Sequence, residues 1–168
     1  MRRRSHCAVA SRAHDDRYTA PVPRDVRMEA PDPDSRDGLL GSFSASVGRL
    51  ARAAMGPVGP QPEGWGVREI LLHAAAWHEA ATRQLTGTPG EVPESDDAFN
   101  AAALEAGAAL DFDEVCRRYQ RSSSALAGTL AELPEEEFAA DRPTGRWVRS
   151  MTRHLTTHAQ ELESSGAA

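Results

Sequence analysis

The stretch that most constrains the fold is WVRSMTRHLTTHAQEL, residues 147–162, because its apolar side chains recur with the period of a helix. In a helix, His154 and His158 lie on one face about one turn apart. Two imidazoles at this spacing can bind one metal ion, and a third ligand from a neighbouring helix would complete a facial site. The apolar residues lie on or beside the same face, so the histidines point toward the core; they are Trp147, Met151, Leu155 and Leu162.

Helical periodicity extends over most of the chain after the first 34 residues. No run of alternating β-branched residues and no hairpin dipeptide indicates a strand. Four long amphipathic helices with one long connection predict an all-α fold, a four-helix bundle. The long helices are expected over residues 35–55, 65–85, 111–133 and 146–163, and a weakly patterned helical piece is expected over 98–109.

Helix starts can be assigned at two places. Asp34 or Ser35 is the predicted N-cap of the first long helix. Asp111 is the predicted N-cap of the third, where Glu114 completes a capping box.

The composition fits one domain with an ordinary core: 168 residues, 40 % hydrophobic and 26 % charged. The formal net charge of -6 argues against nucleic acid as a partner. No apolar run approaches the roughly 20 residues of a membrane span.

Cys7 and Cys116 are the only cysteines, so no disulfide framework is expected and a cytoplasmic location is the simplest inference. Cys116 is expected to be a small buried hydrophobe.

The first 27 residues differ from the rest, with seven arginines against three aspartates. They lack the apolar region of a secretory signal. We expect either a disordered tail or a true start at Met28, and an arm that binds nucleic acid is the less favoured interpretation. The expected organisation is a tail over 1–34, a bundle over 35–163 and a frayed C-terminus over 164–168.

The second long helix offers two candidates for the third metal ligand. At about 100° per residue, His78 falls near the middle of the apolar stripe and His73 at its edge. Periodicity makes His78 the more buried of the two, whereas an open metal site suits an edge position. Histidine pairs of this spacing also occur without metal. The zinc-protease motif HExxH is absent.

Residues 65–73, WGVREILLH, followed by AAAWHEA, resemble the second-helix motif of the DinB-like superfamily, also called DinB/YfiT-like. The segment HLTTH at 154–158 is similar to the HxxxH of its last helix. Phe99-Asn100 and DEVCRRYQRSSSAL resemble its ClbS-like branch. The superfamily includes mycothiol-dependent maleylpyruvate isomerases and bacillithiol or mycothiol S-transferases, and the resemblance covers roughly residues 35–163.

The resemblance implies an up-down-down-up four-helix bundle that binds a divalent metal ion, commonly zinc or nickel. Carried over by position, the ligands are His73, His154 and His158, and His78 becomes a pocket residue. ClbS-like members often lack this triad, so its presence favours the metal-binding members. The resemblance is also compatible with a homodimer.

The leading hypothesis is an enzyme, a metal-dependent S-transferase that joins a low-molecular-weight thiol such as mycothiol to a small electrophile. The alternatives are a sequestering or resistance protein of ClbS-like type and a metal-dependent hydrolase. Trp77, His78 and Tyr119 are the candidate pocket residues, although the spacing of Trp77 and Tyr119 also fits the apolar stripes. No carboxylate is placed as a general base.

Overall fold

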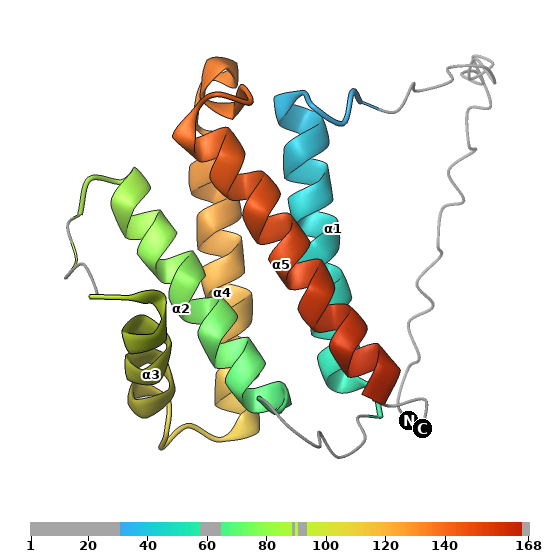
Figure 1. The fold of residues 1–168 in the computed structure, drawn as a ribbon, viewed down its shortest axis with the longest axis vertical. Coiled ribbons are helices and arrows are strands. Elements are labelled where there is room, and N and C mark those ends of the chain that lie inside the picture. Colours follow the sequence, from blue (N-terminus) through green and yellow to red (C-terminus); the bar gives the residue numbers. More distant parts are fainter. Residues whose placement is uncertain (1–30, 58–64, 89, 91–93, 166–168) are drawn as a thin grey trace, which may run out of the picture.

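The structure is a computed structural model that describes residues 31–57, 65–88, 90 and 94–165. All regular structure in these residues is helical, which confirms the predicted all-α class (Figure 1). None of the described helices is long and apolar enough to cross a membrane. The elements are α1 (Arg36–Met55), α2 (Val67–Leu85), α3 (Asp96–Ala106), α4 (Phe112–Ala131), the short 3₁₀ helix η1 (Glu135–Phe138) and α5 (Pro143–Ser165).

The predicted helix starts are present. The Ser35 side chain accepts a hydrogen bond of 3.1 Å from the amide of Gly38, so Ser35 is the N-cap of α1. At the start of α4, the Asp111 side chain accepts from the Glu114 amide at 2.8 Å. The Glu114 side chain accepts from the Asp111 amide at 2.9 Å, which completes the capping box.

The last helix is longer than predicted at both ends, because it begins at Pro143 and ends at Ser165. Proline suits a first helical turn, where its missing N–H would have no partner. Gly145 lets this turn approach the preceding segment closely. A Cβ at Gly145 would lie 2.4 Å from the carbonyl oxygens of Phe138 and Ala139.

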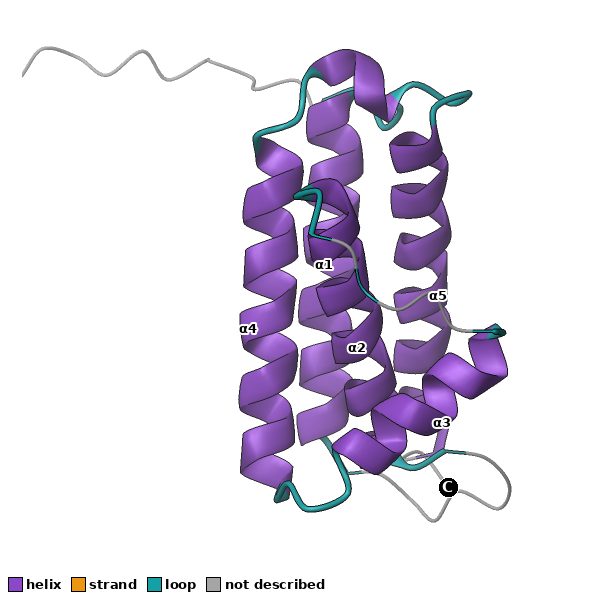
Figure 2. Ribbon diagram, turned by 90° about the vertical axis from the view of Figure 1, so that its left-hand side faces the viewer, coloured by secondary structure: helices purple, strands orange, loops and turns teal. Residues whose placement is uncertain are grey.

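The long helices pack mainly in two pairs, α1 with α5 and α2 with α4, and α1 also contacts α4 (Figures 1 and 2). The short helix α3 packs on α2. Contact between α2 and α5 is sparse by comparison, so these two helices face each other across a less filled part of the molecule.

Arg68 fixes the end of α3 against α2. Its Nη2 atom donates to the carbonyl oxygens of Gly107, Ala108 and Leu110 at 2.6, 3.0 and 3.1 Å. These carbonyls follow the last turn of α3, where helical partners end. The Gly107 carbonyl also accepts from the Leu110 amide at 3.0 Å. Gly107 permits the close approach, because a Cβ there would lie 2.5 Å from the side chain of Leu72.

The predicted tail over 1–34 falls almost entirely outside the described residues, as do Cys7 and Met28. Cys116 is half-buried on α4, and burial raises the pKa of its thiol. This environment fits the expected small hydrophobe, since a reactive cysteine needs a lowered pKa.

His78 lies in the core and is 0 % exposed, deeper than His73 at 4 %, as the periodicity predicted. Its ring packs against Phe43 and Tyr119, with centroids 5.7 Å from each. Its Nδ1 atom lies 3.1 Å from the Ser123 hydroxyl, and its buried Nε2 has no hydrogen-bond partner. Burial lowers the pKa of His78 to about 4.

We expect the metal-free protein to lose stability as the pH falls from about 6.5 to about 4. The unfolded chain binds a proton at His78 near pH 6.5, whereas the folded chain holds this imidazole neutral down to about pH 4. His78→Gln removes the titrating group, so its loss of unfolding free energy between pH 7 and 4.5 should be about 2 kcal/mol smaller than that of the wild type. Urea denaturation at both pH values measures this difference. Equal losses in the two proteins would contradict the assignment.

Candidate metal centre

Three imidazoles from two helices converge on one point. His73 comes from α2, and His154 and His158 come from successive turns of α5. The Nε2 atoms of His73 and His154 are 2.7 Å apart, and those of His154 and His158 are 3.2 Å apart. All three candidate ligand atoms lie within 4.8 Å of one another, so these residues could hold a metal ion.

Asn100 on α3 sets the tautomer of His73. Its Oδ1 atom lies 3.2 Å from Trp77 Nε1 and 2.8 Å from His73 Nδ1. An indole nitrogen only donates, so the Asn100 atom beside it must be the accepting oxygen. His73 therefore donates from Nδ1, and its Nε2 carries a free lone pair that points at His154.

Glu161 plays the same part for His158. Its Oε2 atom lies 2.8 Å from His158 Nδ1, three residues earlier on α5. A carboxylate accepts, so His158 donates from Nδ1, and in the neutral imidazole the lone pair is then on Nε2. Partners of this kind orient metal-binding imidazoles and raise their basicity.

The arrangement suits a positive charge at its centre. Two lone pairs point toward His154, and a proton on the Nε2 of His154 can satisfy only one of them at a time. A divalent ion would satisfy all three nitrogens. Tetrahedral zinc with nitrogen ligands at about 2.0–2.1 Å places those nitrogens roughly 3.3 Å apart. The 3.2 Å separation of His154 and His158 matches this value, the 2.7 Å separation of His73 and His154 is shorter, and all three nitrogens lie within 4.8 Å of one another.

Burial favours the neutral form, which is the form that binds metal, in two of the three histidines. It lowers the pKa of His73 to about 4, and it also lowers the pKa of His154, with a further contribution from His158. Neutral imidazoles are therefore favoured at pH 7, as coordination requires. The Trp65 ring packs on His73 with a centroid separation of 4.8 Å and covers that imidazole.

A cavity of about 320 Å³ opens beside the histidines between α2, α3 and α5. It gives a small molecule access to His73 and His154 from outside the core. Its lining residues are His73, Trp77, Asp96, Asn100, Trp147, Ser150, Met151 and His154.

Of the three predicted pocket residues, the structure brings only Trp77 to this cavity. His78 and Tyr119 lie in the core instead. His78 packs against Phe43 of α1 and against Tyr119 of α4, and the Tyr119 hydroxyl contacts α1. The Tyr119 hydroxyl donates to the Val47 carbonyl at 3.2 Å, and burial raises its pKa. Neither residue has access to a ligand beside His73.

Sequence reasoning assigned no role to Asn100 or to Glu161. Asn100 lies on the weakly patterned helix α3, and the pair Phe99-Asn100 entered only through a family resemblance. The spacing of Glu161 from His158 was readable, since residues three apart are neighbours on a helix surface. That spacing alone did not say which ring nitrogen the carboxylate meets.

The fold and the site define an all-helical protein with three histidines placed to bind a metal ion. The family model of the mycothiol maleylpyruvate isomerase N-terminal domain matches residues 56–163, more than half of the chain. The protein therefore belongs to this family, which is part of the DinB-like superfamily. Comparison with curated proteins and with solved structures found no significant match.

We predict that the purified protein binds about one divalent ion per chain and that His154→Ala abolishes this binding, because two ligands rarely hold an ion against water. His73→Gln should also lose the ion. His78→Gln, five residues further along the same helix, should keep it. Elemental analysis after gel filtration measures all four proteins. Stoichiometric metal in His73→Gln, or loss of metal only in His78→Gln, would show that the site is wrongly assigned.

Asn100→Ala should weaken metal binding about 10- to 100-fold without changing its stoichiometry, because His73 loses the acceptor that sets its tautomer. Asn100→Asp keeps an accepting oxygen and should retain most of the affinity. Competition with a chelating indicator gives both constants. Unchanged affinity in the alanine variant would mean that Asn100 does not orient His73.

Proposed function

We propose that this protein is a metal-dependent S-transferase that joins a low-molecular-weight thiol of the mycothiol type to a small electrophilic molecule in the cytoplasm. The ion, zinc or nickel, would bind to His73, His154 and His158. We also infer that the four long helices form the four-helix bundle of DinB-like proteins. The observation that carries the proposal is the convergence of three oriented imidazoles beside an open cavity.

The ligand set suits thiol chemistry. When bound, a divalent ion supplies a positive charge that lowers the pKa of a nearby thiol. Three neutral imidazoles bring no negative charge, so they do not reduce the positive charge that lowers the pKa of the thiol. They also leave a coordination position open. The family match to a mycothiol-linked domain supports a thiol as the partner.

The residues around the cavity supply the setting for the transfer. Asn100 and Glu161 hold His73 and His158 with their Nε2 atoms turned inward. Trp77 and Trp147 provide apolar walls on which a small molecule can lie. In the transfer, the thiol releases its proton to solvent and its sulfur lone pair forms a bond to the electrophilic carbon. The leaving group departs with the electron pair of the broken bond.

A cobalt-substituted protein tests this proposal. Adding a small thiol should produce intense sulfur-to-metal charge-transfer absorption, because a soft ligand enters the open position. The native protein should also conjugate a thiol to a haloarene faster than the His158→Ala variant. If the cobalt spectrum does not change and conjugation equals that of the variant, the S-transferase assignment is wrong. Hydrolysis or sequestration would then be the better hypothesis.

A further inference from the structure

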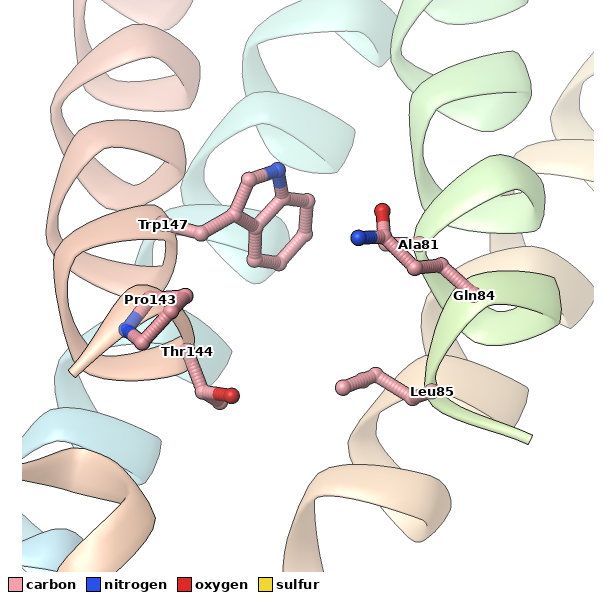
Figure 3. A pocket seen from close by; sticks show the side chains of 6 residues that line it. All are labelled: Ala81, Gln84, Leu85, Pro143, Thr144 and Trp147. Atoms are coloured by element: carbon pink, nitrogen blue, oxygen red, sulfur yellow. The ribbon is translucent and has the colours of Figure 1, made fainter. Parts of the chain in front are cut away.

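A second cavity, of about 190 Å³, lies between the C-terminal end of α2 and the N-terminal end of α5 (Figure 3). Most of its wall is apolar, with the Trp147 ring on one side and Leu85 on the other. Only Gln84 and Thr144 bring polar groups, and no charged side chain lines it. The lining residues are Ala81, Gln84, Leu85, Pro143, Thr144 and Trp147.

This apolar compartment lies next to the cavity at the histidines, and Trp147 lines both. The two cavities follow one another along the face between α2 and α5. One row of lining side chains on α2 has intervals of four residues, and one row on α5 has intervals of three or four. The rows are His73, Trp77 and Ala81 on α2, and His154, Met151 and Trp147 on α5.

Helix geometry gives the distance from the histidines to the compartment. Ala81 follows His73 by eight residues, which at 1.5 Å per residue is roughly 12 Å along α2. Trp147 precedes His154 by seven residues, roughly 10 Å along α5. A molecule that occupies both cavities therefore carries its apolar group roughly 10–12 Å from its reacting atom.

The volume and the lining identify the group that fits. An apolar cavity of about 150 Å³ is enough for a molecule the size of benzene. The Trp147 face favours stacking with an aromatic ring, and the lack of charged lining residues favours an uncharged one. A second copy of the chain is a poorer fit, since a standard protein interface involves about 20–30 residues a side.

We propose that this compartment binds a benzene-sized apolar ring of the substrate, whose electrophilic carbon lies at the three histidines. The substrate class is thus an elongated electrophile with a terminal aromatic ring, rather than a compact polar acid. The position of the electrophilic carbon rests on the proposed S-transferase function, whereas binding of the ring does not. The two parts can therefore be tested separately.

Ring binding is tested with fluorobenzene by fluorine NMR on the full-length protein without metal. Gln84→Phe places a ring at the compartment, because the Gln84 side chain faces Trp147 across the gap (Figure 3). Gln120→Phe is the matched control, an exposed glutamine on α4 that lines neither cavity. We expect saturable binding in the wild type and in the control, and at least tenfold weaker binding in Gln84→Phe. Binding that is absent, or equal in both variants, overturns the proposal.

Substrate length is tested with maleimides in the metal-loaded protein. The thiol adds across the maleimide double bond, so the S–H bond and the carbon–carbon π bond are broken, and one carbon–sulfur and one carbon–hydrogen bond form. N-(6-phenylhexyl)maleimide should react with a kcat/KM about tenfold above N-hexylmaleimide and N-phenylmaleimide, because only its ring reaches the compartment. Gln84→Phe should remove this preference, and Gln120→Phe, which lines neither cavity, should behave like the wild type.

The two experiments separate the possible failures. Fluorobenzene binding at the compartment without any conjugation would leave the ring site standing and overturn the S-transferase function. Conjugation without preference for the long phenyl compound would overturn the substrate class. A change in oligomeric state on Gln84→Phe, with no effect on fluorobenzene, would show that this face is an interface between two copies.

Discussion

The site depends on the two hydrogen bonds that Asn100 accepts from Trp77 and His73. The indole nitrogen can only donate, so it fixes the amide oxygen in place. That oxygen fixes the proton of His73 on Nδ1. These bonds require α3 to lie against α2, and Arg68 holds it there through three backbone carbonyls. A short helix with little apolar periodicity is thereby part of the candidate metal centre.

The sequence predicts the helices because their physics is local. Apolar periodicity locates the long helices to within a few residues, and the capping residues Ser35 and Asp111 fix two starts. The sequence alone could not choose between His73 and His78 as the partner of the α5 histidines. Both are buried, and His78 is the deeper one as predicted, but this difference in depth does not show which of them faces α5. Five residues along a helix turn the side chain by roughly 140°, so the deciding quantity is the neighbour that each ring faces. Only tertiary packing shows that α5 faces His73 and α4 faces His78.

The role of Asn100 lay beyond sequence reasoning for a similar reason. The docking of α3 uses Arg68 and backbone carbonyls, and bonds to a backbone leave no pattern in the sequence of α3. The family resemblance implied that His73, His154 and His158 are the metal ligands. The structure gives the physical reason, because the candidate ligand atoms of these three residues converge. The long helices pair as α1 with α5 and α2 with α4. The face between α2 and α5 is thus left partly open, and both cavities lie there.

The central claim is that the Nε2 atoms of His73, His154 and His158 bind one ion. X-ray absorption spectroscopy of the zinc-loaded protein tests it most directly, because the method counts the nitrogens around the metal and measures their distances. We predict three imidazole nitrogens at about 2.0–2.1 Å, completed by one oxygen ligand from solvent. His73→Gln, if it retains any zinc, should show two imidazoles. A spectrum of the wild type dominated by oxygen ligands, or one with fewer than three imidazoles, would contradict the claim.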